Sequence, residues 1–341
     1  MRRIIVAIVL IVAVGAAGVV VAWQRTQQLL HTPLSTLAAP LVYDVPVGAS
    51  LTSVVWDLNR RGLLEYPRLL LLWARVTHQT TGMKAGEYEL HPGLSPASLL
   101  QLLRSGDVFL HRITFIEGTT FAEALRVLQA DSAIKQTLGA KPDETVMRLL
   151  GEPGIAAEGQ FYPDTYRFAR GTTDLEILSI AHRRLRAELD KAWSERAADL
   201  PLANPREALI LASIVEKETA LERERPQVAG VFVERLRRGM KLQTDPTVIY
   251  GMGAAFDGDI RSADLRRDTP YNTYTRAGLP PTPICLPGAA SIQAAVQPVM
   301  SGAVFFVASG DNDGSHYFSA TLAEHDAAVR RYLAKLRART R

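Results

Sequence analysis

The sequence predicts an α+β protein in which an N-terminal membrane-spanning helix precedes a small strand and helix module and a larger mixed α/β domain. Three observations support this class. Residues 4–23 are all apolar or glycine, residues 41–111 alternate between strand-like and helix-like patterns, and residues 205–215 form an apolar helix with strong start signals. The expected divisions are a cytoplasmic start and anchor at 1–23, a linker at 24–40, the small module at 41–111 and the larger domain at 112–341.

The composition is typical of a folded chain without disulfides or zinc. Of the 341 residues, 47% are hydrophobic and 22% are charged, which allows one large core or two modest ones. The single cysteine, Cys285, excludes an internal disulfide, and no group of His and Cys has zinc-ligand spacing. The net charge of +4 is compatible with an anionic polymer or a membrane surface nearby. We expect neither a metal nor a nucleic-acid partner.

The apolar run at 4–23 has the length of a membrane span. Twenty residues reach about 30 Å as a helix, which is the thickness of the hydrocarbon core of a bilayer. Two arginines precede the run, and Trp23 lies where aromatic residues of the membrane interface are found. We therefore expect an uncleaved, single-pass anchor with its N-terminus in the cytoplasm. The alternatives are a signal peptide cleaved near Val20 and Ala22, whose apolar core would normally be shorter, and a buried core helix, which would normally contain polar residues.

The segment after the anchor changes its pattern at Pro40. Residues 24–40 are polar and lack periodicity, as in a linker. The elements expected in the module that follows are a strand at 41–47, helices at 50–61 and 67–76, a strand at 84–90, a helix at 96–103, and a strand at 109–116.

The larger domain contains one helix that the sequence marks clearly. Before it, a loop at 158–166 is rich in aromatic residues, which either stack on sugar rings or pack the loop onto the domain. Asn204, Pro205 and Glu207 then supply an N-cap residue, a first-turn proline and a capping-box partner. The helix body at 208–215 is apolar nearly all round, which predicts burial inside the domain.

The remaining chain is expected to contain a long functional loop. A second helix is predicted at 226–238 with Gly239 as its stop. Residues 242–288 are rich in glycine, proline and tyrosine and are too many for a neutral connection. Strands at 304–308 and 316–319, followed by a helix from Thr321, would close the domain, and His316 and His325 are expected to be structural.

Glu216 and Glu218 end the buried helix and compete for a chemical role. A carboxyl group that loses its hydration has a raised pKa and can act as a general acid. Residues two apart on a helix point about 200° away from each other, so the two cannot face one cleft. Glu218 continues the inward stripe of Leu211, Ile214 and Val215, which favours it slightly. The alternative is that both glutamates lie on the surface and pair with neighbouring Lys or Arg.

Longer motifs around these glutamates resemble the YceG-like endolytic murein transglycosylases. Residues 212–219 read Ala-Ser-Ile-Val-Glu-Lys-Glu-Thr, and residues 242–251 read Leu-Gln-Thr-Asp-Pro-Thr-Val-Ile-Tyr-Gly. The resemblance continues with Tyr-Asn-Thr-Tyr-Thr at 271–275, Gly-Leu-Pro-Pro at 278–281 and Pro-Gly at 287–288. It extends over nearly the whole chain and includes the anchor and a LysM-like module at 41–111.

The resemblance implies a reaction that needs one carboxyl group. In that family the second glutamate of Glu-Lys-Glu is catalytic, which implies Glu218 here. It would protonate the leaving oxygen of the β-1,4 bond between N-acetylmuramic acid and N-acetylglucosamine, and then deprotonate the muramyl 6-hydroxyl. That hydroxyl would attack C1 and close a 1,6-anhydro ring, so that no second carboxylate, cofactor or metal is needed.

Six loop residues are expected to line the glycan groove beside Glu218. Their amides and hydroxyls would bond acetamido groups, and their tyrosines would stack on pyranose rings. They are Gln243, Thr244, Asp245, Tyr271, Asn272 and Tyr274. The alternative for each is a tight turn held by side-chain to backbone bonds, above all for Asp245 before Pro246 and for Asn272.

The implied substrate is the glycan strand of peptidoglycan, cut in the periplasm by an enzyme anchored in the inner membrane. Action on nascent strands would terminate their elongation, and the peptidoglycan synthases, or penicillin-binding proteins, are candidate partners. Two other functions stay open. One is a membrane-tethered glycan-binding protein that works through the LysM-like module, and the other is a muramidase that uses the same acid with water as nucleophile.

Overall fold

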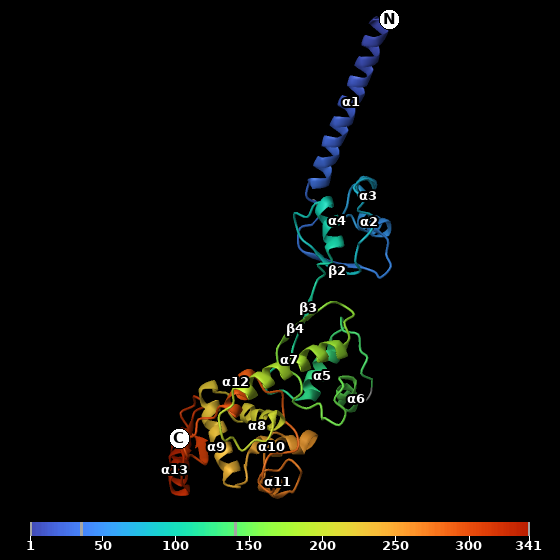
Figure 1. The fold of residues 1–341 in the computed structure, drawn as a ribbon. Helices are drawn as coiled ribbons and strands as arrows, with labels where there is room; N and C mark the ends of the chain where they lie inside the picture. The colour runs from blue at the N-terminus through green and yellow to red at the C-terminus, as the bar shows by residue number, and fades with distance from the viewer. Residues whose placement is uncertain (1, 35–36, 140–141, 340–341) are drawn as a thin grey trace. The chain divides into compact units, whose positions relative to one another are not determined.

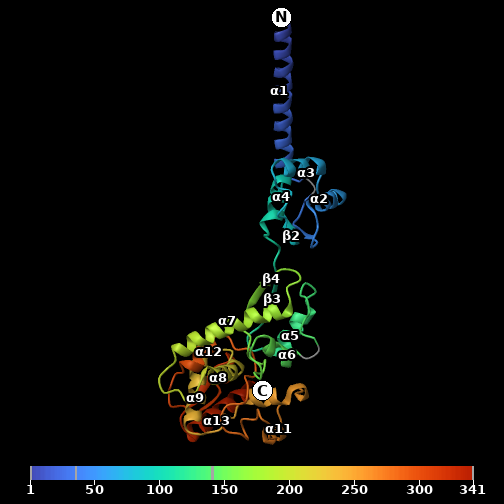
Figure 2. The same ribbon diagram turned by 45° about the vertical axis from the view of Figure 1, so that its right-hand side comes forward.

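The computed structural model describes residues 2–34, 37–139 and 142–339, and it shows a mixed α/β protein with an apolar N-terminal helix (Figures 1 and 2). The chain separates into two compact units. Unit 1 comprises Met1–His111 with Phe168–Arg170, and unit 2 comprises Arg112–Arg167 with Gly171–Arg341. Within the described residues the strands pair as three two-stranded sheets, β1 with β2, β3 with β4 and β5 with β6. Helices therefore supply most of each core.

Unit 1 has the expected order of strand, helix, helix, strand and helix. Its elements after the first helix are β1 (Leu41–Val45), α2 (Leu51–Arg60), α3 (Pro67–Val76), β2 (Gly86–Leu90) and α4 (Pro96–Ser105). Strands β1 and β2 are antiparallel, with Leu41 opposite Leu90 and Val45 opposite Gly86. Helices α2 and α4 begin at capping serines, and Gly106 ends α4 in the left-handed conformation. Such local signals explain why the sequence predicted these limits closely.

Helix α1 (Arg2–His31) continues beyond the apolar run and enters unit 1. Leu30, Leu34 and Leu37 are buried in the same hydrophobic core as residues of α2, α3 and α4. The backbone N–H of Leu34 also donates to the carbonyl of Leu94 (2.9 Å). The described part of the segment expected to be a polar linker is thus helix up to His31, and its leucines on either side of that end pack into the core. Residues 35–36 of that segment lie outside the described residues.

Unit 2 is built around α8. The remaining helices of the chain are α5 (Phe121–Ala130), α6 (Pro142–Leu149), α7 (Asp174–Ser194), α8 (Pro205–Glu218), α9 (Arg225–Arg237), α10 (Asp245–Met252), α11 (Ser262–Arg266), α12 (Ala289–Val296) and α13 (Leu322–Arg339). The remaining strands are β3 (His111–Thr114), β4 (Thr165–Phe168), β5 (Phe305–Ala308) and β6 (His316–Ser319). Helix α8 packs against α7, α9, α10 and α12; Figure 1 shows it among the last three, and Figure 2 shows it beside α9 and α12.

The region from 242 to 288 corrects the sequence-based expectation of a continuous loop. It contains α10 and α11, and α12 begins directly after Gly288. The tight turn considered for Asp245 and Pro246 is instead the first turn of α10, where the missing N–H of the proline costs nothing. Helix α12 has only eight residues, half of them Ala, so the sequence shows no clear apolar periodicity there.

The aromatic loop at 158–166 packs into unit 2. Phe161, Tyr162 and Tyr166 are buried, and the Tyr166 hydroxyl donates to the carbonyl of Tyr162 (2.6 Å). These three rings therefore pack the loop onto the domain and are not available to stack on sugar rings.

The C-terminal elements follow the predicted pattern. Strands β5 and β6 are antiparallel, with Ala308 opposite His316. Helix α13 starts with reciprocal bonds between Thr321 and Glu324, which form the expected cap.

Candidate active site at the end of helix α8

Helix α8 is positioned by its first turn and by its apolar body. The side chain of Asn204 accepts the N–H of Glu207 (3.1 Å), and Pro205 occupies the first turn. The Glu207 carboxylate accepts the N–H of Ala203 (2.7 Å) instead of closing the predicted box on Asn204. Residues 208–215 are all buried. The C-terminal turn, which carries the two glutamates, is therefore held rigidly inside unit 2.

Glu218 is the last residue of α8, and its side chain contacts Thr244, which directly precedes α10. Its Oε1 accepts a hydrogen bond from the hydroxyl of Thr244, the N-cap residue of α10. Burial raises the pKa of Glu218, and the nearby Asp245 raises it further, whereas the Thr244 bond acts in the opposite direction. The residue as a whole keeps an intermediate exposure. This is a protonatable carboxyl group in a poorly hydrated setting that solvent still reaches.

A cluster of threonines holds Thr244 in place. Its backbone N–H donates to the hydroxyl of Thr273 (3.1 Å), and its carbonyl accepts from the hydroxyl of Thr247 (2.8 Å). The hydroxyls of Thr247 and Thr273 lie 2.9 Å apart. The N–H of Gln243, whose φ of 51° is left-handed, donates to the carbonyl of Thr273 (3.1 Å). The residues before α10 are thus fixed to the 271–275 motif, and the Glu218 contact is preorganised.

Asp245 and Tyr274 form a pair at the exposed edge of this arrangement. The Tyr274 hydroxyl donates to Oδ1 of Asp245 (2.6 Å), and burial together with this carboxylate raises the pKa of Tyr274. Asp245 is the first residue of α10 and not part of the tight turn that was considered for it. Its carboxylate remains exposed.

Asn272 and Tyr271 do not face Glu218. The Asn272 side chain is buried and donates to three backbone carbonyls, those of Asp264 (3.2 Å), Leu265 (3.1 Å) and Arg267 (2.7 Å). This is the turn-holding role that the sequence left open, and it leaves the amide no proton for a ligand. Tyr271 bonds to Thr282 through its hydroxyl (2.9 Å) and stacks edge-on against Tyr250. The six predicted groove residues are therefore not gathered on one surface.

Two basic groups act on Glu218: His316, which the sequence suggested was only structural, and Arg235, which the sequence did not single out. Both His316 and Arg235 lower its pKa, against the dominant effect of burial. His316 is held by Glu224, which accepts its Nδ1–H (2.8 Å) and its backbone N–H (3.1 Å). Arg235 is buried and donates to the carbonyls of Leu242 (2.6 Å) and Val304 (2.7 Å). Only the tertiary structure brings β6 and α9 to the end of α8, so no local motif could have indicated them.

The two glutamates have separate surroundings, as expected from their spacing. Glu216 pairs with Arg225 (2.9 Å) and accepts the N–H of Gly288 (3.0 Å), and its side chain is only 5% exposed. Glu216 therefore joins α8 to the starts of α9 and α12, and it is not the surface residue that was considered as an alternative. Lys217 is exposed and donates to the carbonyl of Gly118 (3.2 Å).

A cavity of about 1410 Å³ adjoins the end of α8 without including Glu218 among its lining residues. It is lined by Phe121, Glu158, Lys217, Ile249, Tyr250 and Tyr271, among others. Burial raises the pKa of Glu158 to about 7. The Glu158 carboxyl accepts the N–H of Phe121 (3.0 Å) and the hydroxyl of Tyr250 (3.2 Å), so it braces α5 against α10. In the described part of the chain, no three His, Cys, Asp or Glu residues are grouped as metal ligands.

A profile of the YceG-like family matches residues 43–331. The chain belongs to the YceG-like family. The family resemblance predicted from the sequence is thus confirmed. The motifs at 212–219, 242–251 and 271–275 that carried it lie together in the structure. These YceG-like motifs supply Glu218, Thr244 and Thr273, the three residues at the centre of the site.

Relatives of this YceG-like chain are found among named proteins and solved structures. It is 28% identical over 308 residues to an endolytic murein transglycosylase of Bacillus subtilis (strain 168), which covers 85% of this chain and 84% of the relative. It is 28% identical over 321 residues to an endolytic murein transglycosylase of Streptococcus pneumoniae serotype 2, covering 84% of this chain and 57% of that relative. A crystal structure of a YceG-like protein from Listeria monocytogenes superposes with a TM-score of 0.51 at 27% identity, covering 84% of this chain and 98% of that one.

Proposed function

We propose that this chain is an endolytic peptidoglycan lytic transglycosylase, and that Glu218 is its catalytic acid and base. The observation that carries the proposal is the carboxyl of Glu218 at the end of a buried helix, with a raised pKa and one fixed hydrogen bond. The two relatives named as endolytic murein transglycosylases support peptidoglycan as the substrate.

The reaction that fits one carboxyl group is an intramolecular displacement. Protonated Glu218 gives its proton to the oxygen that links C1 of N-acetylmuramic acid to N-acetylglucosamine, and the C1–O bond breaks. The resulting carboxylate takes the proton of the muramyl 6-hydroxyl as this oxygen bonds to C1. The product is a 1,6-anhydro-muramyl end and a free N-acetylglucosamine 4-hydroxyl, and no water is consumed. Nucleophile and target share one sugar, which supplies a high effective concentration.

We assign the remaining site residues to different tasks. Thr244 is a positioning residue, since its hydroxyl orients the Glu218 carboxyl. Gln243, Asp245 and Tyr274 are proposed to contact the glycan around it, because Asp245 is exposed and Tyr274 is bonded to it. Asn272 supports the loop through its three backbone bonds, and Tyr271 belongs to the wall of the cavity.

The surroundings of the reaction are also part of the proposal. The anchor would cross the inner membrane with its N-terminus in the cytoplasm, which places unit 2 in the periplasm. Unit 1 would be a LysM-like module that binds the same glycan. Cutting nascent strands beside the peptidoglycan synthases would terminate their elongation.

Mass spectrometry of the products from purified sacculi tests the reaction. Wild-type protein should release fragments with anhydro-muramyl ends, and Glu218→Gln should lose about 10² to 10⁴ in rate while it keeps its fold and its binding to sacculi. Glu195→Gln, which changes an exposed glutamate outside the family motifs, is the matched control and should cut normally.

The two alternatives give different results in the same experiment. Fragments that carry an added water in place of the anhydro ring would identify a muramidase. Bound sacculi without any fragments from the wild-type protein would identify a glycan-binding protein. A folded Glu218→Gln variant that cuts at the wild-type rate would overturn the assignment of Glu218.

A further inference from the structure

The exposed face of α3 combines apolar and basic side chains at one end of unit 1. Arg68, Leu72, Arg75 and Val76 follow helical spacing and are all exposed, with Leu72 at 56% and Val76 at 59%. The opposite face, through Leu70 and Ala74, is buried in the core. Helix α3 contains no acidic residue. Large aliphatic side chains that remain this exposed beside arginines are typical of a surface that meets another phase or partner.

The ring of Trp23 identifies what lies beside this face. Trp23 ends the apolar run of α1, and its ring lies 5.4 Å from the ring of Trp73 in α3. Within the described residues, α1 is the helix long and apolar enough to cross a membrane, and its apolar window is not buried by the protein. A span that ends at Trp23 leaves that ring at the boundary between hydrocarbon and headgroups. Trp73 is then at the same depth.

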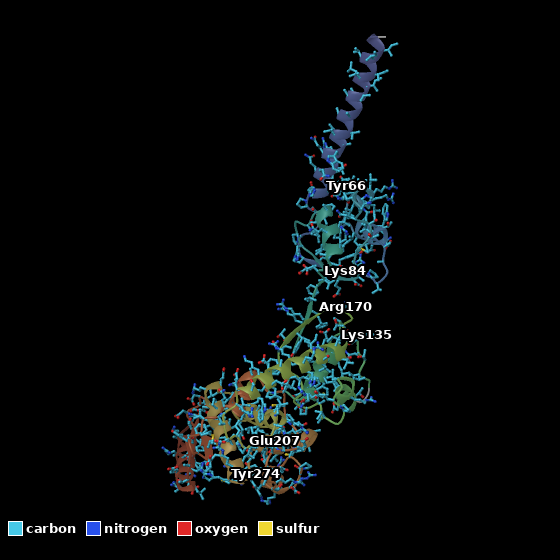
Figure 3. The ribbon with its side chains drawn as sticks, in the orientation of Figure 1. Tyr66, Lys84, Lys135, Arg170, Glu207 and Tyr274 are labelled. Atoms are coloured by element: carbon cyan, nitrogen blue, oxygen red, sulfur yellow. The ribbon has the colours of Figure 1, made fainter. Side chains whose placement is uncertain are left out.

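Unit 1 cannot move away from that depth without unpacking its core. Leu30, Leu34 and Leu37 are buried with the residues of α2, α3 and α4, so the end of α1 is part of the same folded body. Both views place α3 at the end of unit 1 from which α1 leaves (Figures 1 and 2). Tyr66, the N-cap residue of α3 and half exposed, lies at that end, whereas Lys84 lies at the opposite end (Figure 3).

We propose that α3 docks unit 1 onto the outer surface of the anionic phospholipid bilayer that α1 crosses. Leu72 and Val76 enter the acyl chain boundary, and Trp73 and Tyr66 occupy the headgroup layer, where amphipathic rings are stable. Arg68 and Arg75, together with exposed Arg25 of α1, reach lipid phosphates while their aliphatic stems stay on the apolar side. The proposal rests on the membrane anchor proposed above, and not on the chemistry of Glu218.

The consequence is that unit 1 is held flat on the membrane and does not hang from a flexible stalk. The glycan-binding role proposed for unit 1 would then be exerted at a fixed, short distance from the lipid headgroups.

Environment-sensitive fluorophores on the full chain in nanodiscs test the docking. Single cysteines are introduced in separate variants at Leu72, at Val47 and at Val12, and each is labelled with a small nitrobenzoxadiazole group. Val47 is the matched control, since it is 94% exposed and follows β1 at the end where Val45 pairs with Gly86, close to Lys84. Val12 reports the anchor itself. Because the native Cys285 is buried, the wild-type protein treated with the same reagent measures the background labelling.

In nanodiscs that contain anionic lipid and lipids with a quencher near the headgroup, we expect the label at Leu72 to shift to shorter wavelength and lose emission. The label at Val47 should behave as in water, and the label at Val12 should be quenched by lipids with the quencher deep in the acyl chain. In purely zwitterionic nanodiscs the quenching at Leu72 should fall while that at Val12 stays.

Any other pattern of fluorescence contradicts a specific part of the docking proposal. A Leu72 label that matches Val47 while Val12 is quenched would overturn the docking and leave the anchor intact. A Leu72 label that is blue-shifted but not quenched by lipid would show that protein, not lipid, covers α3. Equal quenching at Leu72 in both lipid mixtures would overturn the role of anionic headgroups, and an unquenched Val12 would remove the anchor and the docking together.

Discussion

Glu218 and Thr244 show how one hydrogen bond tunes a buried acid. Desolvation at the end of α8 disfavours the charged form of Glu218, whereas the Thr244 hydroxyl stabilises it. The balance leaves the pKa of Glu218 above its usual value, which is the state that a general acid requires. The Thr244 backbone is held independently by Thr247 and Thr273, so its hydroxyl can be removed without losing the loop.

Thr244→Val should move the alkaline limit of activity to higher pH. The general acid works only while it is protonated, so the rate of the wild-type enzyme falls as the pH rises through the pKa of Glu218. The valine removes the bond that stabilises the carboxylate, which raises this pKa further and keeps the proton to higher pH. The measurement is the pH–rate profile on purified sacculi. Thr114→Val, which removes an exposed hydroxyl on β3 that lies 2.8 Å from the hydroxyl of Thr165, serves as the control and should leave the profile unchanged. A shift to lower pH in the Thr244 variant would contradict the assignment.

At the scale of elements, Glu216 is the junction of three helices. Its carboxylate joins the end of α8 to Arg225 at the start of α9 and to the N–H of Gly288 before α12. Both members of the ion pair are nearly inaccessible to solvent, and a buried charge that loses its partner is costly. The sequence predicted that Glu216 matters less than Glu218 for chemistry, and the structure adds that it matters for stability.

Glu216→Gln should lower the stability of unit 2 by up to about 3–5 kcal/mol, because it leaves the buried Arg225 charge with only the more distant and more exposed carboxylate of Glu117 (3.9 Å). A loss of this size lowers Tm by ~2–4 °C for each kcal/mol in a domain of this length. Scanning calorimetry measures the change, and the double variant Glu216→Gln with Arg225→Met should recover part of it. Below its Tm the folded single variant should still cut sacculi. A folded variant that is as stable as wild type but inactive would instead place Glu216 in the reaction.

For the whole molecule, the packing of α1 into unit 1 connects the membrane segment to the folded protein. We predict that the protein keeps its N-terminus, because the apolar run at 4–23 has the length of a membrane span and α1 continues from it without a break into the core of unit 1. N-terminal sequencing of protein purified from the membrane fraction checks this. Sequences that start within the first residues are expected, and a start just after Ala22 would show that the segment is a leader.

Much of unit 1 and of α8 could be predicted because their signals are local. Capping serines, Gly106, the Asn204 cap and the apolar body at 208–215 act within one or two turns of the chain, and the structure contains the helices that they predicted. Helices α10 and α12 were not expected from the sequence. Each has only eight residues, the Asp245-Pro246 pair at the start of α10 was interpreted as a tight turn, and α12 has no apolar periodicity. Both helices pack against α8, and such contacts between distant parts of the chain cannot be inferred from a local sequence pattern.

Residue types at short or fixed spacing were enough to predict the helix of membrane-spanning length, the order of elements in unit 1, the buried helix α8 and the family. The surroundings of the two glutamates, in contrast, depend on how the chain folds in three dimensions. The tertiary structure brought Thr244, Arg235 and His316 to Glu218, and it gave Arg225 and Gly288 to Glu216. It also turned Asn272 inward to backbone carbonyls, against the expectation that it lines a groove. The physical reason is that pKa shifts and hydrogen bonds depend on distances across the fold between residues far apart in the chain, which no spacing along the sequence specifies.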